Sequence, residues 1–267
     1  MSLNCKICSS DSQKFDSAKI FGIYDTNYYH CSTCGFVQTD EPFWIEEAYS
    51  SAITSLDVGI IQRNIENANK LLFFMKFIPN GICMDFGGGG GMFTRMMRDY
   101  GFDFYHYDKY AENEFARGFE ADMNKKYALI TAFENFEHYV NPMEEIYNLI
   151  EKTDVLYFST NLIASNPPLI KDWWYYLPVT GQHVSFYSLK TLQFIAQKHK
   201  CQLLTNGHDL HVLSKIQIKK FFFKLLNLYD KIRKMFDITR RLKKESNVNK
   251  DYEMIYKILS ENGGKLC

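Results

Sequence analysis

Apolar residues recur with two different periods along the central part of the chain. Short apolar runs with the length of buried strands lie at 82–86, 104–108, 127–133 and 155–160. Apolar residues at helical spacing occupy the segments 60–78, 92–100, about 142–151 and 189–199. Two further short runs, at 201–204 and 211–213, are suited to closing strands. Strands that alternate with helices predict an α/β fold, a doubly wound Rossmann-like sheet that is mostly parallel.

The two ends of the chain differ from this central pattern. Residues 1–45 are rich in aromatic and β-branched residues between turn signals, which favours a small module of short strands and turns. Residues 215–267 begin with a stretch of interleaved basic and aromatic residues and predict a helical tail. The sequence therefore predicts three parts, with boundaries at 1–45, 46–214 and 215–267.

Two C-x-x-C pairs lie within the first part and suggest a metal site. The pairs are Cys5 with Cys8 and Cys31 with Cys34. Each such turn presents two thiolates, and two turns supply the four ligands of a closed, structural zinc site. His30, beside Cys31, is an alternative ligand that four cysteines make unnecessary. Neither pair opens a helix after a strand, so the pattern favours zinc over a redox centre.

The composition indicates the cellular compartment of the protein but says little about its function. The chain has 267 residues and equal numbers of basic and acidic side chains, so its net charge gives no reason to expect a nucleic-acid partner. No apolar run is long enough to span a membrane, and the N-terminus shows no signal segment. Together with the paired cysteines, this predicts a cytoplasmic protein whose thiols stay reduced.

A run of glycines follows the apolar segment 82–86. Glycines in this place let the backbone turn sharply and let a ligand approach closely. A nicotinamide-binding G-x-G-x-x-G/A loop needs a small sixth residue, but here that position is Met92, Phe93 or Thr94. The loop instead has an acid at its start, in the pattern Asp85-x-Gly87-x-Gly89-x-Gly91.

This pattern resembles the first motif of class I S-adenosylmethionine-dependent methyltransferases. Asp108, at the end of the next predicted strand, stands where that family places the acid that binds the ribose hydroxyls. The segment from Phe133 to Pro142, which contains Glu134, Glu137 and His138, looks like the family's E-x-x-E-H-x-x-x-P segment. The segment 181–188 is similar to a G-Q-H-x-S-x-F/Y-S stretch and contains His183.

The resemblance, which covers residues 1 to about 213, implies a cofactor, an acceptor and a set of site residues. The cofactor would be S-adenosylmethionine, held by Asp85, Gly87, Gly89, Gly91, Asp108 and Phe133. A zinc knuckle joined to such a domain is the layout of sugar methyltransferases, which implies a sugar or nucleotide-linked sugar in polysaccharide biosynthesis as acceptor. The alternatives are a catalytically degenerate binding protein and, with less support, an NAD-dependent sugar oxidoreductase.

Transfer of a methyl group to a hydroxyl needs a base, and imidazoles titrate in the right range. His138 and His183 are the candidates, and either one could instead bind substrate or cap a loop. Glu134 and Glu137 are expected to orient an imidazole or bind sugar hydroxyls, although Glu137 could equally be a solvated helix residue. The rings at 173–176 suit either a lid over the substrate or a packed apolar plug.

The basic segment 215–244 leaves two interpretations open. It could lie on an anionic membrane surface, as interfacial helices do. It could also pack its Phe-rich face on the domain or on a second subunit, with its lysines in solvent. The sequence does not fix the oligomeric state or the identity of the methylated atom.

Overall fold

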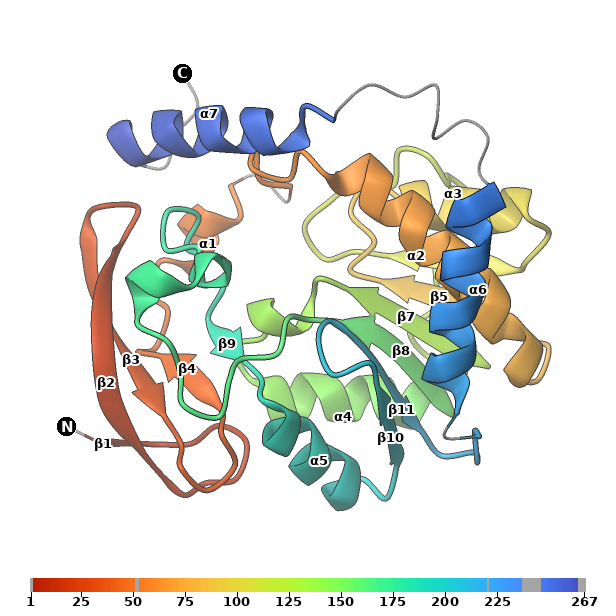
Figure 1. The fold of residues 1–267 in the computed structure, drawn as a ribbon, viewed down its shortest axis with the longest axis horizontal. Coiled ribbons are helices and arrows are strands. Elements are labelled where there is room, and N and C mark those ends of the chain that lie inside the picture. Colours follow the sequence, from red (N-terminus) through yellow and green to blue (C-terminus); the bar gives the residue numbers. More distant parts are fainter. Residues whose placement is uncertain (1, 51–52, 220, 237–245, 264–267) are drawn as a thin grey trace.

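The computed structural model describes residues 2–50, 53–219, 221–236 and 246–263. Within these residues the strands form two sheets (Figure 1). The larger sheet has six strands in the spatial order β10-β11-β8-β7-β5-β6. These strands are β5 (Cys83–Phe86), β6 (Phe104–Tyr107), β7 (Leu129–Phe133), β8 (Val155–Ser159), β10 (Gln202–Thr205) and β11 (Leu210–Ser214).

Four neighbouring strands of this sheet, β8, β7, β5 and β6, run parallel, and β11 and β10 close the edge antiparallel. The helices α2 (Ile60–Phe74) and α3 (Met92–Asp99) share one core cluster with α6 (Phe222–Phe236), whereas α4 (Pro142–Lys152) and α5 (Leu189–Lys198) share the other. Alternate residues of each strand enter the two clusters, as the two-residue period of a strand requires. The predicted doubly wound α/β fold is confirmed.

The second sheet is antiparallel and contains β1 (Ser2–Asn4), β2 (Asp11–Ile20), β3 (Tyr24–His30), β4 (Val37–Thr39) and β9 (Ser185–Phe186). β2 and β3 are longer than the short strands predicted, because their many polar residues hide the strand period. β9 comes from the segment of the chain that lies between β8 and α5. The N-terminal sheet therefore incorporates a strand of the central part rather than standing apart from it.

Shorter elements complete the described chain. They are α1 (Ile45–Ala48), α7 (Val248–Glu261) and the 3-10 turns η1 (Met75–Phe77), η2 (Phe136–His138), η3 (Ile170–Asp172) and η4 (Trp174–Tyr176). The predicted helix 60–78 ends earlier than expected, because η1 tightens its last turn. α6 and α7 confirm a helical tail (Figure 1). Leu259 of α7 packs with Leu56, Leu177 and Val179. No described helix is long and apolar enough to cross a membrane.

Candidate active site and metal centre

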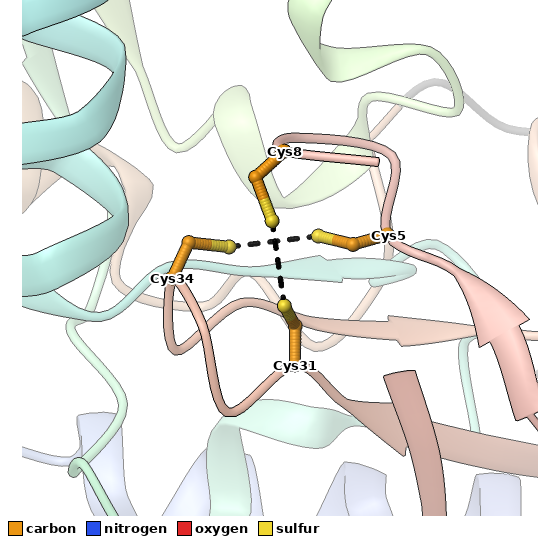
Figure 2. A group of neighbouring side chains, drawn as sticks. All are labelled: Cys5, Cys8, Cys31 and Cys34. Carbon is orange, nitrogen blue, oxygen red and sulfur yellow. Dashed lines mark hydrogen bonds between the residues drawn. The ribbon is translucent and has the colours of Figure 1, made fainter. Parts of the chain in front are cut away.

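The four cysteines of the N-terminal pairs converge on one point. Figure 2 shows their sulfur atoms pointing toward a common centre. Cys5 Sγ lies 3.5 Å from Cys34 Sγ, and Cys8 Sγ lies 3.5 Å from Cys31 Sγ. All four sulfur atoms lie within 4.8 Å of one another. We refer to these residues as the four-cysteine cluster.

The four-cysteine cluster has the chemistry and size of a structural zinc site. Sulfur ligands at about 2.3 Å from a tetrahedral zinc ion are about 3.8 Å apart, close to the observed separations. Four thiolates leave no open coordination position, so a metal here would hold the chain together rather than take part in chemistry. The neighbouring His30 is not among the residues whose ligand atoms converge.

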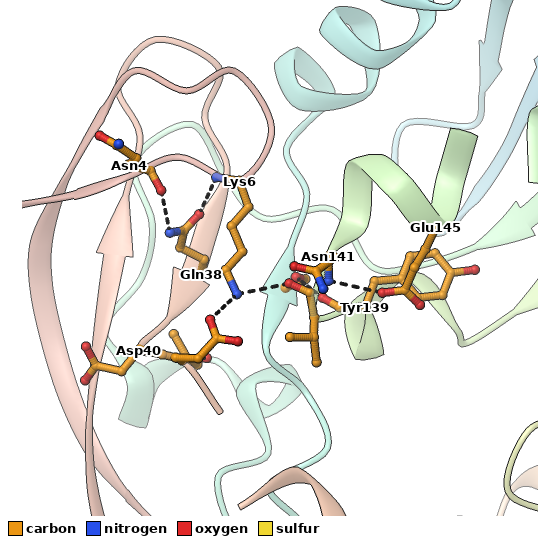
Figure 3. Close-up of polar contacts among 11 residues, drawn as sticks. Asn4, Lys6, Gln38, Asp40, Tyr139, Asn141 and Glu145 are labelled. Carbon is orange, nitrogen blue, oxygen red and sulfur yellow. Dashed lines mark hydrogen bonds and ion pairs between the residues drawn. The ribbon is translucent and has the colours of Figure 1, made fainter. Parts of the chain in front are cut away.

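Hydrogen bonds connect the four-cysteine cluster to the larger domain at two places. Lys6, between Cys5 and Cys8, donates from its backbone to Gln38 and from its ammonium group to the carbonyl of Val140 and to Glu41 (Figure 3). On the other side, the hydroxyls of Ser188 and Thr191 donate to the carbonyl of Cys34.

These contacts fix the positions of two segments that carry predicted site residues. Val140 follows η2, which ends at His138, and Ser188 follows β9 and is the N-cap of α5. Gly35, which follows Cys34, has φ +74°, and a Cβ on it would overlap Ser188 Oγ. The second cysteine turn therefore packs directly on the start of α5.

The glycine loop lies at the carboxyl end of β5 and leads into α3. Gly87 has φ +69° and donates its N–H to the carbonyl of Tyr107 at the end of β6. A side chain on Gly87 would overlap the side-chain amide of Asn135. The loop is thus closely packed between the ends of two neighbouring strands, as the sequence predicts for a ligand-binding turn.

Asp108 holds the glycine loop and its own following turn in place. Its Oδ2 accepts a hydrogen bond of 2.9 Å from the N–H of Gly89, and its Oδ1 accepts from the N–H groups of Tyr110 and Ala111. An ionised carboxylate offers about four acceptor sites, so these bonds leave capacity for a ligand hydroxyl. Asp108 and the loop residues Gly87 and Gly89 line the same cavity.

Asp85 is 2% exposed and lies beneath the glycine loop. Its Oδ1 accepts a hydrogen bond of 2.7 Å from Thr131, and its Oδ2 has no hydrogen-bond partner among the described residues. Burial raises the pKa of Asp85 to about 7, and the nearby charge of Asp108 acts in the same direction. Buried acids with an unused oxygen are costly unless a ligand or a proton satisfies them.

Two imidazoles that line the cavity meet a buried carboxylate. One ligand-capable atom from each of Glu137, His138 and His183 lies within 4.8 Å of the other two. The rings of His138 and His183 are 4.9 Å apart and perpendicular. Nδ1 of His138 lies 3.2 Å from the carbonyl of Gln182, and Nδ1 of His183 lies 2.7 Å from the carbonyl of Tyr175. A carbonyl only accepts, so each Nδ1 carries a proton and each Nε2 is left as the basic nitrogen.

Burial keeps the two imidazoles uncharged near neutral pH. It lowers the pKa of His138 to about 4 and, together with His138 itself, the pKa of His183 to about 3. Burial raises the pKa of Glu137 to about 7. Burial and the nearby charge of Glu137 together raise the pKa of Glu134 to about 7. Both imidazoles are therefore unprotonated near neutral pH, and burial makes each a weaker base than the ordinary imidazole that the sequence led us to expect.

The two glutamates are held differently from what the sequence suggested. Glu134 has φ +47° and accepts a hydrogen bond of 2.6 Å from the hydroxyl of Ser159. Glu137 is completely buried, so the alternative of a solvated helix residue is wrong. It lies in η2, a turn that points its side chain inward beside the hydroxyls of Tyr175 and Thr160.

The four rings at 173–176 divide between the two predicted roles. Tyr175 and Tyr176 are at most 1% exposed and form part of a packed plug, in which Tyr176 contacts Tyr28 edge to face. Trp174 is 60% exposed and lines the cavity. Tyr175 also lines the cavity from its packed position, and the exposed Trp174 is placed to cover a ligand.

The glycine loop, Asp108, the two imidazoles, Glu134 and Trp174 line one cavity of about 960 Å³. Its walls come from the glycine loop, the ends of β6 and β7, the start of α2, the segment 174–183 and the first turn of α7. Of the predicted site residues, it brings together Asp85, Gly87, Gly89, Asp108, Phe133, Glu134, His138 and His183. Gly91 lies just behind it as the N-cap of α3.

Sequence reasoning missed several residues of this wall. Arg63 projects from α2 and forms an ion pair with Asp57. Burial lowers the pKa of Arg63, but the ion pair with Asp57 outweighs it, and the charges of Glu134 and Glu137 raise this pKa further. Asn67, one turn further, is 7% exposed and also lines the cavity. Their spacing was the available signal, because both lie on the apolar stripe of the predicted helix. A polar side chain on that stripe is unusual and can indicate a ligand site.

Comparison with known proteins agrees with this architecture. Residues 61–206 match the protein family described as “Methyltransferase domain”. Because the match spans more than half of the chain, the protein belongs to this methyltransferase family. The oxidoreductase alternative is therefore without support. A search of curated proteins finds no match.

The solved structures that match this chain are distant in sequence. One is magnesium protoporphyrin IX methyltransferase from Synechocystis PCC 6803 with bound SAH, at 14% identity over 64% of this chain and 92% of that chain, with a TM-score of 0.44. A putative O-methyltransferase from Nostoc punctiforme PCC 73102 shares 12% identity over 66% of this chain and 61% of that chain, with a TM-score of 0.43. A third, 1,6-didemethyltoxoflavin-N1-methyltransferase from Burkholderia thailandensis, shares 12% identity over 58% of this chain and 79% of that chain, with a TM-score of 0.40.

Proposed function

We propose that the protein is an S-adenosylmethionine-dependent methyltransferase that acts on a small polar acceptor. The observation that carries this proposal is the shared cavity, in which the acid and glycines of the nucleotide-type loop face two unprotonated imidazoles. The glycine loop and Asp108 would hold the cofactor, and His138, His183 and Glu134 would act on the acceptor. When bound, S-adenosylmethionine supplies an electrophilic methyl group on a sulfonium.

The protein's own contribution is alignment, exclusion of water and removal of a proton. An acceptor hydroxyl that enters the cavity beside His138 and His183 would give its proton to an Nε2 nitrogen as the carbon–oxygen bond forms and the carbon–sulfur bond breaks. A neighbouring carboxylate would stabilise the imidazolium, and Glu137 is placed to do so. Alignment of the two reactants in a closed cavity would account for much of the remaining acceleration.

We further propose a sugar, free or linked to a nucleotide, as the acceptor. The proposal rests on the resemblance of the cysteine pairs and the E-x-x-E-H segment to sugar methyltransferases. The mixture of carboxylate, imidazole, amide and indole groups in the cavity suits a polyhydroxylated ligand. A role in polysaccharide biosynthesis and a cytoplasmic location remain predictions, as do the three-part division of the chain and zinc as the metal of the four-cysteine cluster.

Replacing Asp108 with Ala is expected to weaken S-adenosylmethionine binding about 10- to 100-fold, because a hydrogen bond from a ligand hydroxyl to a charged group is lost. Isothermal titration calorimetry of the metal-replete protein with S-adenosylmethionine, S-adenosylhomocysteine and NAD measures this. Asp99→Asn, on the exposed face of α3, is the matched control and should bind like the parent protein. If neither adenosyl ligand binds the parent protein, the degenerate alternative is correct; binding of NAD alone would reject the methyltransferase proposal.

A second prediction concerns the proton on Asp85. Its pKa is raised to about 7 in the free protein, so below pH 7 most molecules carry a proton there. A bound cation favours the ionised form, and binding should therefore release a proton. We expect affinity for S-adenosylmethionine to rise with pH up to about 7 and then to level off.

Calorimetry at pH 6 in buffers of different ionisation enthalpy detects the released proton directly. Asp85→Asn should remove both the proton release and the pH dependence. Asp122→Asn, an exposed acid distant from the loop, should change neither. A parent protein that binds the ligand without proton release would show that Asp85 does not face the cationic part of the cofactor.

A further inference from the structure

The helix α6 has two separate apolar faces, and only one of them is covered within the described part of the chain. Phe222, Phe223 and Leu226 are buried against α2, beside which the helix lies in Figure 1. The ring of Phe222 lies 4.9 Å from that of Phe74. This confirms that a Phe-rich face of the tail packs on the domain, which was one of the two interpretations of the sequence.

The second apolar face points to solvent. Leu228, Ile232, Met235 and Phe236 are 54%, 45%, 69% and 72% exposed. Their spacing of four, three and one residues places them on one side of the helix. We call these four residues the α6 stripe. Single exposed apolar residues are ordinary, but a continuous stripe of large ones marks an interaction surface.

Basic side chains border the α6 stripe. Lys224 precedes Leu228 by one turn and Lys231 precedes Met235 by one turn, so each lies beside the stripe. Both are exposed and make no ion pair within the described part of the chain. Lys234 is also exposed, although it and Arg233 pair with Asp230.

The charge of this region stands out from that of the whole protein. Residues 215–244 contain eleven Lys and Arg residues and two Asp residues, while the complete chain is neutral. The rest of the protein therefore carries a net negative charge. An anionic surface would attract this one region and repel the remainder, which fixes the orientation of the protein on that surface.

We infer that α6 is a membrane-binding element that docks on anionic lipid. The α6 stripe would enter the boundary between headgroups and acyl chains, and Lys224 and Lys231 would contact lipid phosphates. A nucleic acid would use the lysines but not the stripe. In a symmetric dimer through this face, both copies would bring their lysines together, which opposes association.

The inference is independent of the proposed acceptor and is tested on the full chain with liposome co-sedimentation. Vesicles of phosphatidylcholine with about 30% phosphatidylserine should pellet the protein at low salt, and phosphatidylcholine alone should not. Raising the ionic strength should release it, because surface attraction is screened. Lys224→Gln with Lys231→Gln should weaken binding roughly 25-fold, since each lysine near the surface contributes about fivefold.

The apolar contribution is tested with Ile232→Glu and Met235→Glu, which we expect to abolish sedimentation with anionic vesicles. Both side chains are exposed, so the fold should be kept; unchanged calorimetric binding of S-adenosylhomocysteine or an unchanged circular dichroism spectrum checks this. The matched controls are Ile23→Glu, at a distant exposed apolar position, and Lys257→Gln on α7. Absence of parent binding to anionic vesicles, or equal binding by the stripe variants, overturns the inference. So does a stable dimer that depends on Ile232 and does not bind vesicles.

Discussion

Cys8→Ser is expected to lower the free energy of unfolding by roughly 5 kcal/mol. Structural zinc contributes about 10–16 kcal/mol in small finger peptides, and a chain with its own large core should depend on it for only part of that. For a protein of this size, the change corresponds to a fall in melting temperature of roughly 10–20 °C. Removal of the metal with a chelator should have a similar effect.

The loss should also reach the proposed active site. The four-cysteine cluster holds Lys6 in place, and Lys6 donates a hydrogen bond to Val140, which is two residues from His138. It also holds the carbonyl of Cys34, which accepts hydrogen bonds at the start of α5. If the cysteine turns separate, the segments that carry His138 and His183 lose their supports. We therefore expect Cys8→Ser to lower methyl transfer even at temperatures where the protein stays folded.

Three measurements test this prediction: zinc content by mass spectrometry, thermal unfolding, and methyl transfer. Methyl transfer is measured at about 20 °C, well below the expected melting range. Cys201→Ser is the matched control, because Cys201 is partly buried, lies outside the cluster and donates to the carbonyl of His199. Its zinc content and melting temperature should stay close to those of the parent protein. A parent protein that contains no metal after purification in zinc-supplemented medium would contradict the assignment of a zinc site.

The sequence predicted the central fold well because its strands are buried on both faces. Strands of this kind appear in the sequence as continuous apolar runs, and β8 is an example. The helices between them show apolar residues at regular helical spacing. The convergence of the four cysteines was also predictable, since both cysteine pairs are local turns whose geometry depends on few residues.

Contacts between distant segments were not predictable in the same way. β9 has only two residues, and its pairing with β4 depends on how the chain returns from the larger sheet. Glu137 was undecided because its burial is set by η2 and by Tyr175, which lies far along the chain. Arg63 and Asn67 were treated as part of a helix, although their position on its apolar stripe indicated the cavity.

The predicted proton transfer singles out His138 and His183 for the largest effect on catalysis. Both rings are fixed through Nδ1 by a backbone carbonyl, and both line the cavity. His138 is the more exposed of the two and is therefore better placed to meet an acceptor. His183 would orient it, since the two rings are in perpendicular contact. In its ionised form, either Glu134 or Glu137 would supply the negative charge that a transient imidazolium requires.

His138→Asn is therefore expected to lower kcat about 100- to 10,000-fold, the usual contribution of a general base. Affinity for S-adenosylhomocysteine should change by less than about threefold, because the cofactor is assigned to the glycine loop and Asp108 rather than to His138. His183→Asn should have a smaller effect on kcat, and His208→Asn, an exposed histidine in a turn, should have none. Single-turnover methyl transfer from labelled S-adenosylmethionine to a panel of nucleotide sugars separates chemistry from product release. Full activity in both His138→Asn and His183→Asn would mean that the acceptor loses its proton to another group, and Glu134 would then be the first residue to replace.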